Sequence, residues 1–141
     1  MSKIAVVFWS GTGNTEAMAG YIAEGAKSLG SEVSLFHPGA FSADMVNDFD
    51  AIAFGCPAMG AEELEDSEFE PMFDAVKSSL SGKKIALFGS YDWGDEEWIR
   101  TWAQDCEDSG CLLVDQPLAV HNAPEDSDKS ACRALGEKLA R

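Results

Sequence analysis

Short apolar runs recur along the chain at regular intervals. They cover residues 4–9, 33–36, 51–56, 85–88 and 112–120, the last of them broken by Asp115-Gln116-Pro117. Runs of this length, bounded by Gly, Pro and polar residues, are typical of buried β-strands. The pattern therefore predicts five strands.

Between these runs, apolar residues repeat every three or four positions, which is the spacing of one face of a helix. Such stretches cover residues 18–29, 69–80, 98–106 and 131–139. Strands that alternate with amphipathic helices form a parallel sheet with helices on both faces. We therefore expect an α/β fold: a three-layer, doubly wound, five-stranded parallel sheet with about five helices, in one domain that spans residues 1–141. In such sheets, ligands bind beyond the carboxyl ends of the strands.

A donor-rich loop, Ser10-Gly11-Thr12-Gly13-Asn14-Thr15, follows the first predicted strand, and we expect a helix from Glu16. Its glycines let backbone N–H groups turn inward, its hydroxyls and amide add donors, and the helix N-terminus attracts anions. The loop therefore predicts phosphate binding without a cationic side chain. It is neither the P-loop, which needs Gly-Lys-Ser/Thr, nor the dinucleotide fingerprint, which needs glycine at position 16. The alternative is a loop whose hydroxyls only cap the helix.

A second loop, Cys56-Pro57-Ala58-Met59-Gly60-Ala61-Glu62, follows the third predicted strand. The polarisable thioether of Met59 favours aromatic partners, and Gly60 lets the adjoining peptide adopt more than one orientation. The loop is consistent with a turn against a flat ring. The alternative is that Met59 is a core residue and Gly60 an ordinary turn residue.

A third loop, Gly89-Ser90-Tyr91-Asp92-Trp93-Gly94, follows the fourth predicted strand. Trp93 offers a flat surface on which an aromatic ligand can stack. The alternative is that Trp93 covers the helix end beside Trp98 and Trp102. Taken together, the three loops indicate a ligand with one phosphate and a broad ring, and flavin mononucleotide (FMN) is such a ligand.

The charge balance narrows the choice of partners. The chain has 25 acidic and 10 basic residues, a formal net charge of −15 and an isoelectric point near 4.2. This charge repels nucleic acid and anionic membranes and favours partners with basic patches. The alternative is that the acidic residues form a solvated surface that keeps the protein soluble, and the two explanations are compatible.

The cysteines and the N-terminus indicate the compartment. Cys56, Cys106, Cys111 and Cys132 form no C-x-x-C pair, so we expect reduced, mostly buried thiols and no metal site. The first residues pass directly into an apolar run that lacks a signal-peptide cleavage site. We therefore expect a cytoplasmic protein.

Three motifs carry a family resemblance: residues 9–15, the turn Ala58-Met59-Gly60, and residues 89–94. They resemble the flavodoxins, in particular the short-chain clostridial type. The resemblance implies strand order 2-1-3-4-5 and non-covalently bound FMN. It further implies a low-potential one-electron carrier, not an enzyme, that cycles between semiquinone and hydroquinone and serves ferredoxin-type redox enzymes with basic docking patches. From the charge and the lack of an obvious apolar patch we expect a monomer.

The resemblance also implies roles for individual residues. Residues 10–15 would bind the phosphate, Met59 and Trp93 would cover the two faces of the flavin, and Glu62 would accept a hydrogen bond from the ring N3–H. Asn122 would approach the ribityl chain. The predicted cofactor-binding residues are Ser10, Gly11, Thr12, Gly13, Asn14, Thr15, Ala58, Met59, Gly60, Ala61, Glu62, Ser90, Tyr91, Asp92, Trp93, Gly94 and Asn122.

Two positions depart from the family pattern. Related sequences commonly have an acidic residue where Ala61 stands and a glycine where Asp92 stands. These departures bear on the flavin potential and on turn geometry.

Two other functions fit the sequence less well. An FMN-dependent quinone or NAD(P)H reductase would need room for a nicotinamide, which Met59 and Trp93 would occupy, and a basic cluster for its phosphates. A phosphoacceptor signalling domain shares the strand order but needs an aspartate after the third strand, where this chain has Cys56-Pro57. The carrier is therefore the preferred function.

Overall fold

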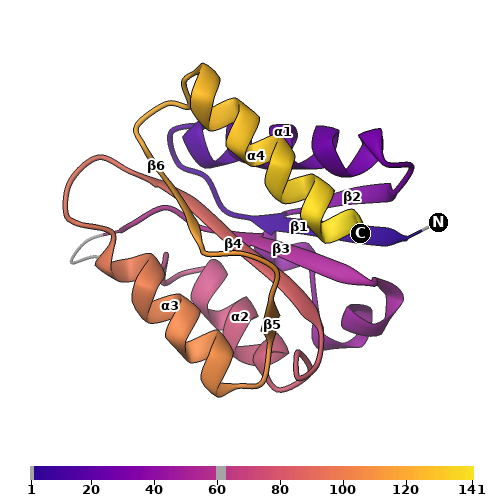
Figure 1. The fold of residues 1–141 in the computed structure, drawn as a ribbon. Coiled ribbons are helices and arrows are strands. Elements are labelled where there is room, and N and C mark those ends of the chain that lie inside the picture. Colours follow the sequence, from indigo (N-terminus) through magenta and orange to yellow (C-terminus); the bar gives the residue numbers. More distant parts are fainter. Residues whose placement is uncertain (1, 60–62) are drawn as a thin grey trace.

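A parallel sheet forms the centre of the computed structural model, which describes residues 2–59 and 63–141 (Figure 1). Its strand order is β2-β1-β3-β4-β5, and β6 also pairs with β4. The predicted order 2-1-3-4-5 is confirmed. The strands are β1 (Lys3–Phe8), β2 (Glu32–Phe36), β3 (Ala51–Gly55), β4 (Lys84–Tyr91), β5 (Leu112–Leu113) and β6 (Leu118–His121).

The fifth predicted strand is divided into β5 and β6, which pair with different parts of β4. Leu112 lies opposite Lys84 near the start of β4, and His121 lies opposite Tyr91 at its end. The interruption falls at Asp115-Gln116-Pro117, as the sequence pattern indicated, and Pro117 has no N–H to donate to a strand. A hydrogen bond from Lys138, followed by one from the Gln116 N–H, lowers the pKa of Asp115. Lys138 belongs to the C-terminal helix α4 (Asp126–Ala140), so this contact joins the interruption to that helix.

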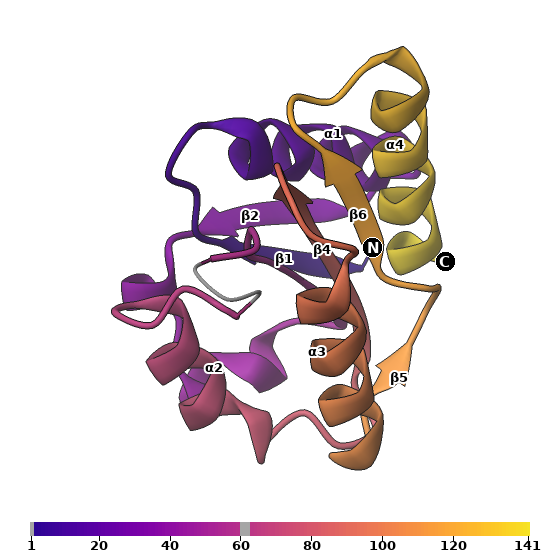
Figure 2. The ribbon, with the colours of Figure 1, turned by 90° about the vertical axis from the view of Figure 1, so that its left-hand side faces the viewer.

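Helices cover both faces of the sheet (Figures 1 and 2). Helices α1 and α4 lie on one face, and α2 and α3 lie on the other. Their bounds are α1 Asn14–Ser28, α2 Phe69–Lys77, α3 Glu97–Asp108 and α4 Asp126–Ala140. The remaining helical turns are the short 3-10 segments Pro38–Ala40 and Ala43–Asp48. None of the helices in the described part of the chain is long and apolar enough to cross a membrane.

The central strands have two apolar faces because successive side chains point to opposite sides of the sheet. In β1, Ile4, Val6 and Phe8 belong to the core under α1 and α4. Ala5 and Val7 belong to the core under α2 and α3. Burial on both faces explains why these strands are continuous apolar runs instead of alternating ones.

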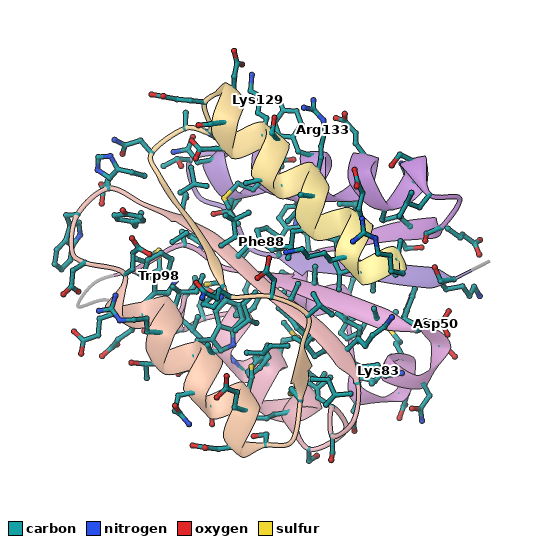
Figure 3. All side chains as sticks on the ribbon, in the orientation of Figure 1. Asp50, Lys83, Phe88, Trp98, Lys129 and Arg133 are labelled. Atoms are coloured by element: carbon teal, nitrogen blue, oxygen red, sulfur yellow. The ribbon has the colours of Figure 1, made fainter. Side chains whose placement is uncertain are left out.

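Helices α1 and α4 approach each other closely at two glycines. A Cβ built at Gly25 would lie 2.0 Å from the Arg133 carbonyl oxygen, and one built at Gly136 would lie 2.0 Å from the Ile22 carbonyl oxygen. No larger residue fits at this distance. On the outer surface of the same helix pair, the Arg133 guanidinium and the Lys129 ammonium lie over the Tyr21 ring, 5.0 and 5.6 Å from its centroid (Figure 3).

Candidate functional site

A cavity of about 310 Å³ opens at the carboxyl ends of β1, β3 and β4. These ends lie on the left of Figure 1, the side that faces the viewer in Figure 2. The cavity is lined by Trp9, Ser10, Gly11, Thr12, Asn14, Thr15, Pro57, Ala58, Met59, Ser90, Tyr91, Asp92 and Asn122. The structure therefore brings together the three loops that the sequence singled out.

The loop after β1 presents backbone donors at the start of α1. Gly13 is the N-cap of α1 and has a left-handed backbone angle, φ 98°, that favours glycine, so the helix begins at Asn14 and not at the predicted Glu16. The Ser10 hydroxyl accepts hydrogen bonds from the Gly13 and Glu16 N–H groups, at 3.1 and 3.3 Å. The N–H groups of Asn14 and Thr15 have no acceptor inside the helix and are free to bind an anion.

Ser90 joins the three loops. Its hydroxyl lies 3.0 Å from the Thr15 hydroxyl, and both side chains are buried. Its carbonyl oxygen accepts a hydrogen bond from the Ala58 N–H at 3.1 Å. The loop after β1 and the loop after β3 are thus both fastened to β4 at one residue.

The exit from β3 is held against β4 and α3. A Cβ at Gly89 would lie 2.1 Å from the Cys56 carbonyl oxygen, so the two backbones meet where only glycine fits. The same oxygen accepts a hydrogen bond of 3.0 Å from the indole N–H of Trp98, at the start of α3 (Figure 3). Trp98 therefore supports the loop that carries Met59.

We expect Trp98→Phe to lower the free energy of unfolding by about 1 to 2 kcal/mol more than Trp102→Phe does. Both indoles are almost completely buried, but the Trp102 N–H has no hydrogen-bond partner among the described residues, so only the first substitution breaks a bond. Urea unfolding at one FMN concentration measures both. Equal losses would mean that the bond to Cys56 contributes nothing.

Met59 pairs with Glu63, and the segment from Glu63 leads into α2. Met59 and Glu63 exchange two backbone hydrogen bonds of 2.9 Å each. The buried carboxylate of Glu65 then accepts the N–H groups of Ser67, Glu68 and Phe69, at 2.9, 2.8 and 2.8 Å, and the Ser67 hydroxyl. Burial raises the pKa of Glu65, but these hydrogen bonds outweigh it and lower the pKa to about 2. Glu65 is thus the cap of α2 and not part of a solvated acidic surface.

We expect Glu65→Gln to lower the free energy of unfolding at pH 7 by about 1 to 2 kcal/mol, because the amide cannot accept all of these donors. A carboxyl group whose pKa is lower in the folded than in the unfolded state stabilises the fold at pH values above its ordinary pKa, near 4.5. This stabilisation is lost as the pH falls toward the folded-state pKa of about 2. The difference in the free energy of unfolding between wild type and variant, measured with urea, should therefore disappear as the pH is lowered from about 4.5 to about 2. The exposed Glu68→Gln serves as the control and should show no such gap. A gap that persists at pH 2 would contradict the assignment.

The far rim of the cavity is formed by the end of β4 and the segment after β6. The Tyr91 ring packs against Trp98 and His121, with centroid distances of 5.6 and 5.2 Å. Burial, followed by the nearby Glu96 carboxylate, raises the pKa of Tyr91, so the phenol stays neutral. Asn122 donates its backbone N–H to the Tyr91 carbonyl oxygen at 2.8 Å and has φ 62°, a left-handed angle that asparagine tolerates.

Of the predicted site residues that the structure describes, all but Gly13, Trp93 and Gly94 line the cavity. Trp93 is 56% exposed. The prediction that residues 89–91 lie in a loop was wrong, because pairing with β6 extends β4 to Tyr91. Gly60, Ala61 and Glu62 lie outside the described residues, and their roles stay predictions.

Trp9 and Pro57 line the cavity although they were not among the predicted site residues. Each directly precedes a segment that was predicted to bind the cofactor. Their position at the carboxyl end of a predicted strand was therefore the signal that could have identified them. All four cysteines are buried and free, as expected.

The donors of the cavity fit FMN. Among the described residues that line it there is no Lys or Arg, so a phosphate there would be held by N–H and O–H donors and by the N-terminus of α1. Met59 and Tyr91 add a thioether and an aromatic ring to the lining. Fold and site together define a doubly wound α/β protein that binds a nucleotide with a phosphate and a flat ring.

Comparisons with known proteins agree with this class. The flavodoxin family model matches residues 6–136. The chain is 43% identical to the flavodoxin of Clostridium beijerinckii over 135 residues, which are 96% of this chain and 97% of that protein. It is 44% identical to the flavodoxin of Megasphaera elsdenii over 138 residues, 98% of each. The solution structure of the two-electron reduced Megasphaera elsdenii flavodoxin superposes with a TM-score of 0.88 and covers 97% of this chain and 98% of that one.

The chain belongs to the flavodoxin family. Flavodoxins bind FMN and are low-potential electron carriers that serve redox enzymes and are not enzymes themselves.

Proposed function

We propose that residues 1–141 form one domain that holds FMN non-covalently in the cavity beyond β1, β3 and β4. The observation that carries this proposal is that one cavity is lined by an uncharged donor loop together with Met59 and Tyr91. Bound FMN supplies the one-electron chemistry. The protein positions the cofactor, limits solvent access and sets the local potential.

The loop after β1 holds the phosphate in this proposal. The N–H groups of Asn14 and Thr15 donate to the phosphate oxygens, and the hydroxyls of Thr12 and Thr15 add further donors. Because Thr15 also contacts Ser90 at 3.0 Å, its hydroxyl is already oriented before the ligand arrives. A site that is ordered before the ligand binds loses less conformational entropy on binding.

Residues from the loop after β3 and the loop after β4 would hold the ring. Met59 would contact one face, and the Trp93 side chain, now 56% exposed, would cover the other. Asn122 approaches the ribityl chain from the segment after β6. The proposed contacts of the ring also include Ala58, Gly60, Ala61, Glu62, Ser90, Tyr91, Asp92 and Gly94.

Acidic residues set the electrostatic environment of the cavity. The Asp92 carboxylate lines it, and the chain as a whole carries a formal charge of −15. One carboxylate about 10 Å from the ring raises the free energy of an added negative charge by roughly 0.4 to 1.7 kcal/mol. The carboxylates therefore oppose reduction to an anion, which lowers the potential of the carrier.

The same charge selects partners. We infer that the redox enzymes that exchange electrons with this protein have basic docking patches, as ferredoxin-type partners do, and that the carrier itself is a monomer. Attraction between opposite charges raises the rate of encounter and is screened by salt. The same charge of −15 would repel nucleic acid and anionic membranes, so we expect neither to be a partner.

A titration of the FMN-free protein with FMN and with riboflavin tests the proposal. Riboflavin lacks the phosphate, so we expect it to bind about 10- to 100-fold more weakly, which is the effect of losing one group held by charge-assisted hydrogen bonds. Quenching of flavin fluorescence gives both affinities. Equal affinities would refute the phosphate assignment, and failure to bind either flavin would refute the site.

A further inference from the structure

Helix α3 ends in a turn that brings two side chains together. Ser109 follows the helix, and Gly110 after it has φ 88°. The Gly110 N–H donates to the Glu107 carbonyl oxygen at 3.0 Å, and the Cys111 N–H donates to the Cys106 carbonyl oxygen at 3.0 Å. These two bonds define a Schellman motif, in which the third-last helical residue and the residue after the glycine usually contact each other.

In this chain both contacting positions are cysteines. Cys106 is completely buried and Cys111 is 7% exposed, and both belong to the core between the sheet and helices α2 and α3. A hydrogen bond with the Cys111 thiol, followed by burial, raises the pKa of Cys106. The same hydrogen bond lowers the pKa of Cys111. Cys111 is therefore both the more accessible thiol and the one that ionises first.

The other two cysteines are in a different situation. Cys56 follows β3 beside the cavity, and Cys132 lies in α4 on the opposite face of the sheet. Both are completely buried, and burial raises the pKa of each to about 12. They are internal controls, because an inert buried thiol should not react.

We propose that Cys106 and Cys111 form a reversible thiol–disulfide site that hydroperoxides oxidise and small dithiols reduce. The turn fixes the two residues at opposite ends of one backbone hydrogen bond, which is a separation that a disulfide can span.

The reaction is balanced with one hydroperoxide per disulfide. The Cys111 thiolate attacks an oxygen of hydrogen peroxide, the O–O bond breaks, and a sulfenic acid forms with release of water. The Cys106 sulfur then attacks the sulfenic sulfur, the S–O bond breaks, and a second water leaves. The two thiols lose two electrons and two protons, and the peroxide is reduced to two waters. A dithiol reverses the product by thiol–disulfide exchange.

The site lies away from the FMN cavity. Cys111 immediately precedes β5, whose Leu112 pairs with Lys84 at the start of β4, whereas the cavity lies at the other end of β4. The disulfide would tie the end of α3 to the edge of the sheet. We therefore expect oxidation to raise the midpoint of urea unfolding and to leave the affinity for FMN unchanged within about threefold.

Peptide mapping of the FMN-loaded protein tests the proposal. The protein is treated with hydrogen peroxide, quenched with an alkylating reagent, digested and analysed by mass spectrometry. We expect a link between Cys106 and Cys111, a loss of about two mass units for the two hydrogens removed, and alkylation of Cys56 and Cys132 only after unfolding. Treatment with dithiothreitol should restore four thiols.

Variants sharpen the test. Cys111→Ser and Cys106→Ser should abolish the link, whereas the control Cys132→Ala should form it as the wild type does. The proposal is overturned if four thiols persist in peroxide, if Cys111 proceeds to sulfinic acid without a link, or if the link joins another pair of cysteines. The wild-type map decides the matter even where a variant does not fold.

Discussion

Replacing Asn14 by aspartate is expected to lower the affinity for FMN about 1000-fold. Asn14 is the first residue of α1 and lines the cavity next to the N–H groups that we assign to the phosphate. The substitution turns a hydrogen-bond donor into an anion of the same shape. Repulsion between unit charges about 4 Å apart costs about 4 kcal/mol at an effective dielectric constant of ~20, which is about a thousandfold in affinity. Flavin fluorescence quenching measures the change.

Two controls separate this repulsion from general effects of charge. Asn47→Asp makes the same chemical change at an exposed position in the 3-10 segment 43–48, away from the cavity, and should change the affinity less than threefold. Riboflavin, which has no phosphate, should bind wild type and Asn14→Asp almost equally. An FMN affinity that Asn14→Asp leaves unchanged would show that the phosphate lies elsewhere.

Gly25→Ala is expected to cost the largest amount of stability, about 2 to 4 kcal/mol. The added methyl group would lie 2.0 Å from the Arg133 carbonyl oxygen, 2.7 Å from the carbonyl carbon and 2.8 Å from the Cα, so helices α1 and α4 must move apart. Overpacking of this kind usually costs about 1 to 3 kcal/mol and occasionally more. Here the clash is with backbone atoms, which cannot rotate away as a side chain can. Urea unfolding at a constant FMN concentration gives the value.

The matched control lies in the same helix. Gly20 is exposed, and a Cβ built there meets nothing within 4 Å. Gly20→Ala should therefore stabilise the protein by about 0.5 to 1 kcal/mol, because alanine loses less backbone entropy in a helix. If both substitutions stabilised the protein, the close contact between α1 and α4 would have to be looser than described.

The fold could be predicted from sequence because its local and long-range signals agree. Each buried strand is a short apolar run, each helix has a repeating apolar face, and parallel strands joined by helices have few possible arrangements. The division of the last strand was visible at residues 115–117. What could not be seen was that β6 pairs along β4 to Tyr91, since pairing partners far apart in sequence leave no local pattern.

The site was predicted in outline and less well in detail. Loops after strands could be located, but the burial of single side chains depends on neighbours from other elements. Glu65 shows the difference. It is the one buried carboxylate among the described acidic residues and caps α2, yet nothing in its local sequence distinguishes it from Glu63 or Glu68. Similarly, only the packing of α3 on the sheet reveals that Trp98 supports Cys56 while Trp102 has no such partner among the described residues.

The loop after β1, which we propose holds the phosphate, carries no positive charge, so the FMN-loaded and empty forms of the protein should differ in net charge. A binding site with lysine or arginine would neutralise most of the charge that its ligand brings. Here the described lining contains no such residue, so the bound phosphate adds about 1.5 to 2 negative charges to the formal −15 of the chain. The FMN-loaded form should therefore elute later than the empty form from an anion exchanger and focus at a lower pH. Cofactor loading thus changes electrophoretic mobility and strengthens attraction to basic surfaces.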